Sequence, residues 1–83
     1  MSYDDIINSC KEKIRYGDLW QDFSVEELVE YGRIKAKRGL LLYKNHNIEK
    51  FEDDIMDAIN ILVMSIQRIK YHREYGNFDV LPI

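Results

Sequence analysis

The stretch from Glu52 to Ile69, EDDIMDAINILVMSIQRI, decides the fold of this chain. Apolar residues dominate it, and they recur at the three- and four-residue spacing of a helix that buries one face. Between residues 55 and 66 the only polar side chains are those of Asp57, Asn60 and Ser65. A carboxylate is costly to bury unless it is paired, hydrogen-bonded or bound to a metal. We therefore expect Asp57 to meet a cation or a polar partner.

The helix that contains this stretch should run over residues 48–75, with Asn47 as its N-cap. A second long helix is expected over 25–44, because Ser24 followed by Glu27 forms a capping box. A shorter helix over 3–16 should begin after Ser2. No strand pattern is present, so the sequence predicts a single all-α domain over residues 1–83, with a tail at 77–83 that docks as an extended arm.

Both long helices carry apolar residues on two sides. The expected core stripe of the third helix contains Ile48, Phe51, Ile55, Ile59, Leu62, Val63, Ile66 and Ile69. Met56, Ile61 and Met64 fall outside that stripe. A helix that is apolar on two sides needs two partners. We therefore expect the two long helices to form an antiparallel hairpin that pairs with another copy into a four-helix core, with the first helix on its flank.

Gly32 and Gly39 lie seven residues apart on one face of the second helix. Glycine lowers helix propensity, so its presence there has a cost. Two interpretations stay open from the sequence: the glycines permit close approach of another helix, or they are merely tolerated.

The composition favours a folded domain and disfavours nucleic-acid-binding and membrane proteins. The 83 residues are 46% hydrophobic, 12% aromatic and carry a net charge of −3, which predicts a folded domain and makes nucleic acid an unlikely partner. Cys10 is the only cysteine, so no internal disulfide is expected. Acidic residues near the start argue against a signal peptide, and no apolar run reaches the roughly 18 residues of a membrane span. We expect a cytoplasmic protein with no membrane contact.

Acidic pairs at a spacing of three residues are weak evidence by themselves. Among 15 acidic residues, about two or three such pairs arise by chance. Three occur: Glu27 with Glu30, Glu49 with Glu52, and Asp54 with Asp57. The apolar surroundings of Asp57 raise it above this background. A carboxylate cluster repels itself unless a cation sits within it, and oxygen ligands suit Mg²⁺ or Mn²⁺. Lys35 and Arg38, one turn apart, are either a solvated face or a clamp for phosphate.

Three groups of residues, in this order, resemble the all-α nucleotide pyrophosphohydrolases of the MazG type, and most closely the nucleotide-modification-associated domain of phages. The groups are Lys13…Tyr16-Gly17-Asp18…Trp20, then Lys35-x-x-Arg38, then Glu52-Asp53-Asp54-x-x-Asp57-x-x-Asn60. The resemblance covers about residues 13–69.

The resemblance implies a homodimer or homotetramer that hydrolyses a nucleotide triphosphate to its monophosphate and pyrophosphate. It implies Mg²⁺ or Mn²⁺ ligands at Glu27, Glu30, Asp53, Asp54 and Asp57, the catalytic carboxylates being Glu27, Glu30, Asp54 and Asp57. Lys35, Arg38 and Asn60 would then contact the nucleotide. Asp54 departs from the pattern, because glutamate is usual at its position.

Three functions follow as hypotheses. The first is a metal-dependent dNTP pyrophosphohydrolase. The second is a non-catalytic helical dimer that acts as an adaptor, in which Asp57 and Asn60 are buried polar contacts that fix how helices pair. The third, disfavoured by the acidic charge balance, is nucleic-acid binding through the second helix.

Overall fold

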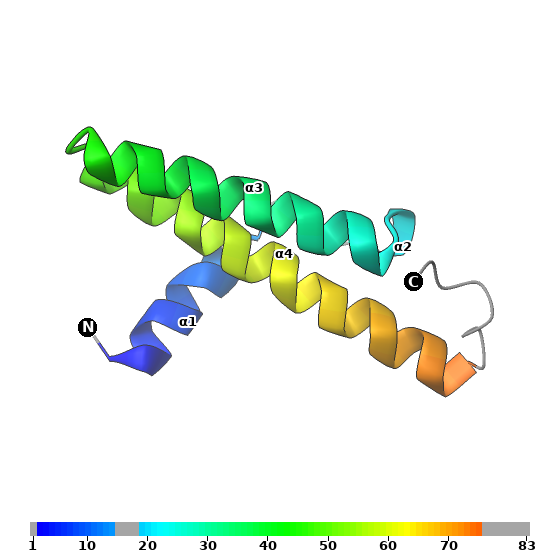
Figure 1. Ribbon diagram of the computed structural model, residues 1–83. Coiled ribbons are helices and arrows are strands. Elements are labelled where there is room, and N and C mark those ends of the chain that lie inside the picture. The colour runs from blue at the N-terminus through cyan, green and yellow to red at the C-terminus, as the bar shows by residue number, and fades with distance from the viewer. Residues whose placement is uncertain (1, 15–18, 76–83) are drawn as a thin grey trace.

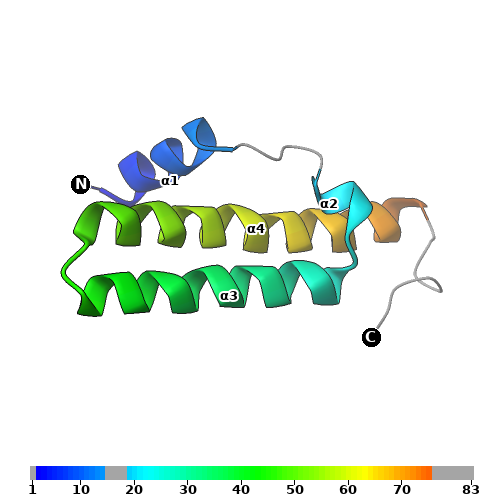
Figure 2. The same ribbon diagram turned by 90° about the horizontal axis from the view of Figure 1, so that it is seen from above.

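The structure is a computed structural model that describes residues 2–14 and 19–75, and these residues form helices and connecting turns without a strand. The helices are α1 (Tyr3–Glu12), α2 (Leu19–Asp22), α3 (Val25–Lys44) and α4 (Ile48–Tyr75). The two long helices, α3 and α4, run antiparallel and side by side as a hairpin, and α1 and α2 pack on the other side of α4 (Figures 1 and 2). The expected all-α fold is confirmed. The expected tail at 77–83 lies outside the described residues.

Local signals in the sequence set where these helices begin. The Ser24 hydroxyl accepts a hydrogen bond from the Glu27 amide, and the Glu27 carboxylate accepts one from the Ser24 amide, both at 3.1 Å. This capping box satisfies two amides that the first turn of a helix leaves without partners. Asn47 caps α4 through a weaker contact of 3.4 Å from the Lys50 amide. The bounds of α3 and α4 are therefore those expected from the sequence.

The first helix is shorter than the pattern predicts. It ends at Glu12, with Lys13 as its C-cap, whereas the apolar spacing extends the expected helix to residue 16. Ile14 should continue the apolar stripe of that helix, but 46% of its surface is exposed. An extra turn that buries no apolar surface gains little stability from packing, which accounts for the early end.

Small residues bring α3 and α4 close together at two points of their contact. A Cβ atom added to Gly32 would lie 2.8 Å from Cγ and Cδ2 of Leu62, and one added to Gly39 would lie 3.0 Å from Cδ1 of Ile55. Ala58 is buried in the same contact. The question that the sequence left open is thus answered: the two glycines permit close approach of α4.

The buried core differs from the one expected. Its centre is a cluster of Leu28, Ile61 and Met64, against which Phe23 and Tyr31 pack. Ile61 and Met64 fall outside the predicted stripe of α4. Four residues of that stripe are exposed instead, namely Ile48, Leu62, Val63 and Ile66. The prediction of this core stripe is therefore wrong for the single chain. Two members of the stripe, Leu62 and Ile55, do pack on Gly32 and Gly39, while Ala58 and Ile61 of α4 are fully buried in the hairpin.

Within the described part of the chain, no helix combines the length and the apolar character that crossing a membrane requires.

Candidate functional site

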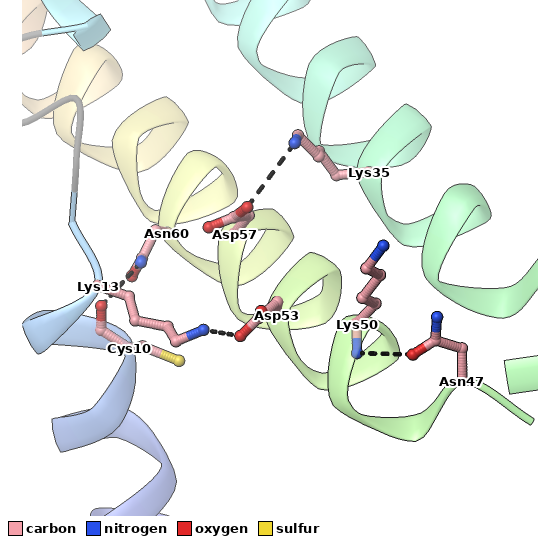
Figure 3. A network of polar contacts seen from close by, with 8 residues as sticks. All are labelled: Cys10, Lys13, Lys35, Asn47, Lys50, Asp53, Asp57 and Asn60. Carbon is pink, nitrogen blue, oxygen red and sulfur yellow. Dashed lines mark hydrogen bonds and ion pairs between the residues drawn. The ribbon is translucent and has the colours of Figure 1, made fainter. Parts of the chain in front are cut away.

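Two ion pairs join α3 to α4 at the place where the sequence predicts a site. Lys35 Nζ lies 3.7 Å from Asp57 Oδ2 (Figure 3), and Arg38 Nε lies 3.2 Å from Asp54 Oδ2. Each pair joins residues equally distant from the turn between the helices, so a step of three residues along one helix matches a step of three along the other. The predicted phosphate clamp and two of the predicted carboxylates therefore do converge.

Asp54 is the most deeply buried of these carboxylates. Its residue is 6% exposed, and its Oδ2 accepts no hydrogen bond. Arg38 Nε is near enough for an ion pair, but its N–H is not aligned for a hydrogen bond to that oxygen. The Arg38 side chain is 64% exposed. A buried carboxylate is thus covered by a mainly exposed cation.

The other two polar residues of the predicted site connect α4 to α1. Lys13 of α1's C-cap forms an ion pair with Asp53, and the Asn60 side-chain amide donates a hydrogen bond of 2.8 Å to the carbonyl oxygen of Cys10 (Figure 3). Cys10 is the buried residue of α1. Burial raises the pKa of the Cys10 thiol, an effect that nearby Lys13 partly offsets. Asn60 therefore already has a structural task, which is to hold α1 on α4.

A hollow of about 240 Å³ opens beside the two ion pairs. Its lining combines three basic and three acidic side chains, namely Lys35, Arg38, Lys50, Asp53, Asp54 and Asp57. The sequence analysis did not single out Lys50. Its position one turn before Asp53 and Asp54 could have indicated that it lies beside them, because residues three or four apart share a helix face.

Glu27 and Glu30 are not part of this hollow. Glu27 is committed to the capping box of α3, and Glu30 pairs with Arg33 at 2.9 Å on the exposed surface. This contact raises the pKa of Arg33, first through the hydrogen bond and then through the charge of Glu30. Glu30 precedes Lys35 by five residues, which is about 7.5 Å along the helix, and Glu27 lies farther still. The expected approach of these two glutamates to the Asp53–Asp57 level does not occur within this chain.

The carboxylates do not form a ready metal cage. Among the residues that the structure describes, no three His, Cys, Asp or Glu side chains are grouped so that they could hold a metal ion. Asp53, Asp54 and Asp57 are instead each paired with a cation, from the C-cap of α1 or from α3.

Comparison with known proteins finds no family model, no curated protein and no solved structure that matches the chain. The case for a function consequently depends on the residues and their geometry.

Proposed function

We propose that the chain self-associates through one apolar face of the hairpin. This apolar face is defined by six exposed side chains, Val29, Leu40 and Tyr43 of α3 and Ile48, Leu62 and Ile66 of α4. Helical spacing places them on one side of each helix. Contacts across the hairpin bring the two sides together: Tyr43 packs on Phe51 with ring centroids 5.5 Å apart, and Gly32 adjoins Leu62.

The size of this face suits a second copy of the chain. The six side chains are 40–58% exposed, which corresponds to roughly 500 Å² of apolar surface, the size of the largest apolar patch on a typical monomer, and such a patch is often functional. A standard interface covers about 800 Å² on each partner, and the rest would come from their neighbours. Two hairpins joined in this way form the expected four-helix core. Further pairing into a tetramer would need a second face.

The apolar face and the hollow lie on different sides of the hairpin. Leu40 and Arg38 are two residues apart, about 200° around α3, and Leu62 lies about 140° from Asp57 around α4. Association would therefore leave the hollow open, one on each chain.

Glutamate in place of Ile66 tests the association, with Ile34→Glu as the matched control. Ile34 is 56% exposed, similar to Ile66 at 58%, but it lies outside the apolar face. We expect sedimentation to show a dimer for the unchanged chain and for Ile34→Glu, and a monomer for Ile66→Glu. A monomeric unchanged chain at micromolar concentration would contradict the association.

For the hollow, we propose a nucleotide-binding site of the pyrophosphohydrolase type. The observation that supports it is the convergence of Lys35 and Arg38 with Asp57 and Asp54 beside a hollow. Lysine and arginine bind phosphate oxygens through charge-assisted hydrogen bonds. When a triphosphate enters, these two cations exchange their carboxylate partners for phosphate. The exchange frees the carboxylates, of which Asp54 already has an oxygen without a hydrogen bond.

Mg²⁺ enters this proposal together with the nucleotide. Asp54 and Asp57, with Asp53 beside them, supply the hard oxygen ligands that Mg²⁺ prefers. The ion would supply charge neutralisation at phosphate and activation of a water. The residues of the chain contribute binding and orientation: Lys35 and Arg38 hold phosphate, and the half-buried Asp57 accepts a proton or a hydrogen bond from water. Glu27 and Glu30 are left out of this set because they lie away from the hollow.

The test is release of pyrophosphate from a panel of canonical and modified dNTPs with Mg²⁺. We expect turnover of at least one nucleotide, its loss in Asp57→Ala, and its retention in Glu52→Gln, a change of an exposed acidic residue on the same helix that does not line the hollow. A panel without turnover, combined with no thermal shift from Mg²⁺ and nucleotide, would remove the enzymatic proposal.

A second candidate function is a non-catalytic helical dimer that serves as a protein-interaction or adaptor module. The observation that favours it is that the polar residues of α4 have partners within the chain: Asp57 has Lys35, and Asn60 has the Cys10 carbonyl. In this case these residues fix helix packing and the hollow has no ligand. Stability that does not respond to Mg²⁺ plus nucleotide would support the adaptor, whereas stabilisation would count against it, because a ligand of the folded state raises the free energy of unfolding.

A further inference from the structure

We propose that Lys50, together with the outer edge of Arg38, is the first contact of a polyphosphate chain in the hollow, and that this contact needs no divalent cation. The inference rests on the proposed nucleotide site and names the residues through which that site first recognises its ligand. The shared chemistry is a chain of phosphates, free or attached to a nucleoside.

One basic side chain of the hollow is available to an anion. Asp57, Asp54 and Asp53 each have a cation partner, which are Lys35, Arg38 and Lys13 respectively. Lys50 also lines the hollow, and among the described residues its ammonium group has no ion pair. The lining holds three basic and three acidic side chains, but Asp53 is paired with Lys13 from outside the hollow, so Lys50 is left, within the described ranges, as the basic group without an ion-pair partner. A divalent cation would have to break existing ion pairs before it could bind, whereas an anion can make its first contact with Lys50 before any ion pair breaks.

Arg38 can bind an anion without leaving Asp54. Its Nε faces the carboxylate at 3.2 Å, and the side chain is 64% exposed. A guanidinium group has five N–H donors in a planar fork, so the donors on the outer edge remain available when Nε is engaged. Asp54 also holds the group near the hollow.

Lys50 is placed to meet the same anion. It belongs to the first turn of α4, whose amide groups carry partial positive charge, and its own amide is held by Asn47 Oδ1. Its side chain extends from α4 towards α3 (Figure 3). Lys50 and Arg38 therefore come from opposite walls of the hollow, as two groups that grip neighbouring phosphates must.

Calorimetric titration of the full chain with inorganic tripolyphosphate, in metal-free buffer at low salt, tests the inference. We expect binding without Mg²⁺ and a loss of affinity of about five- to tenfold in Lys50→Met, the effect of one partly exposed charge-assisted contact. The matched control is Lys37→Met, which removes an exposed lysine of α3 that does not line the hollow and should change affinity less than twofold. A parallel titration with dATP shows whether a nucleoside adds affinity to the same contact, with the same loss in Lys50→Met.

Two results would overturn the inference: no binding of tripolyphosphate unless Mg²⁺ is present, or equal affinities of the Lys50→Met and Lys37→Met variants. Both are separable from the enzymatic proposal. Tripolyphosphate binding that depends on Lys50, with no turnover of any dNTP, would keep this contact and remove the hydrolase. Turnover of a dNTP with an unchanged KM in Lys50→Met would keep the hydrolase and remove the Lys50 contact.

Discussion

Replacing Asp54 by Asn distinguishes a buried carboxylate that serves ligand binding from one that stabilises the fold. The substitution keeps the shape of the side chain and removes its charge. Asp54 is 6% exposed, and its Oδ2 has no hydrogen bond. A buried polar atom without a hydrogen bond costs about 1–3 kcal/mol, and more when it is charged. Removing the charge should recover part of that cost.

The ion pair with Arg38 works in the opposite direction. At 3.2 Å two unit charges attract by about 5 kcal/mol at an effective dielectric constant of 20. Arg38 is 64% exposed, so solvent screening reduces the net contribution to about 1 kcal/mol. We therefore expect Asp54→Asn to leave the free energy of unfolding unchanged or to raise it by about 1 kcal/mol.

Arg38→Gln should have the opposite effect. It leaves the buried carboxylate without its cation, and we expect a loss of about 1–2 kcal/mol. In the double variant this loss should disappear, because the carboxylate that needed the cation is gone. The double-mutant cycle should give a coupling energy of about 1 kcal/mol.

Urea denaturation followed by circular dichroism measures all four chains, at one chain concentration because association shifts the midpoint. The gain in nucleotide affinity that Mg²⁺ provides is measured in parallel and should be lost in Asp54→Asn. A loss of more than about 2 kcal/mol in Asp54→Asn would refute the reasoning, since a loss of that size marks a structural carboxylate.

Two further sites give predictions about packing. Asn60→Leu should release α1, because the Cys10 carbonyl loses its 2.8 Å hydrogen bond. The raised pKa of Cys10 lowers its thiolate fraction at any given pH, so Ellman's reagent should react slowly with the unchanged chain at pH 8 and faster with Asn60→Leu; equal rates would show that Asn60 does not hold α1. Gly32→Ala should lower the free energy of unfolding by about 1 kcal/mol after the gain in helix propensity, because the new Cβ would lie 2.8 Å from both Cγ and Cδ2 of Leu62. Gly39→Ala should be neutral, since the nearest atom, at 3.0 Å, is the far end of a flexible side chain; the prediction fails if Gly39→Ala is the more damaging of the two.

The register of the hairpin was within reach of the sequence. Arg38 and Asp54 stand equally far from His46, as do Lys35 and Asp57, and these are the pairs that the structure forms. The same rule places Glu30 at the level of Leu62, well away from the acidic stretch. The spacing within a motif does not reveal which residues of the two helices lie at the same level, because each motif lies within one helix.

The sequence by itself determined the helices and the charge pattern. The capping box at Ser24 and the turn at residues 45–47 are local features, so they specify where α3 and α4 begin and end without help from distant residues. The three-residue steps that align Lys35 with Arg38 and Asp54 with Asp57 are local for the same reason.

Only the tertiary structure decided which side of each helix is inside. An apolar stripe indicates that one face of a helix is shielded from water, but it does not indicate which partner covers that face. In the hairpin Ile61 belongs to the buried core of the single chain, and Ile66 stays on the surface. The packing of α3 on α4 also buries Asp54 beneath Arg38, because the orientation of a helix depends on the fit of its neighbour and not only on its own periodicity.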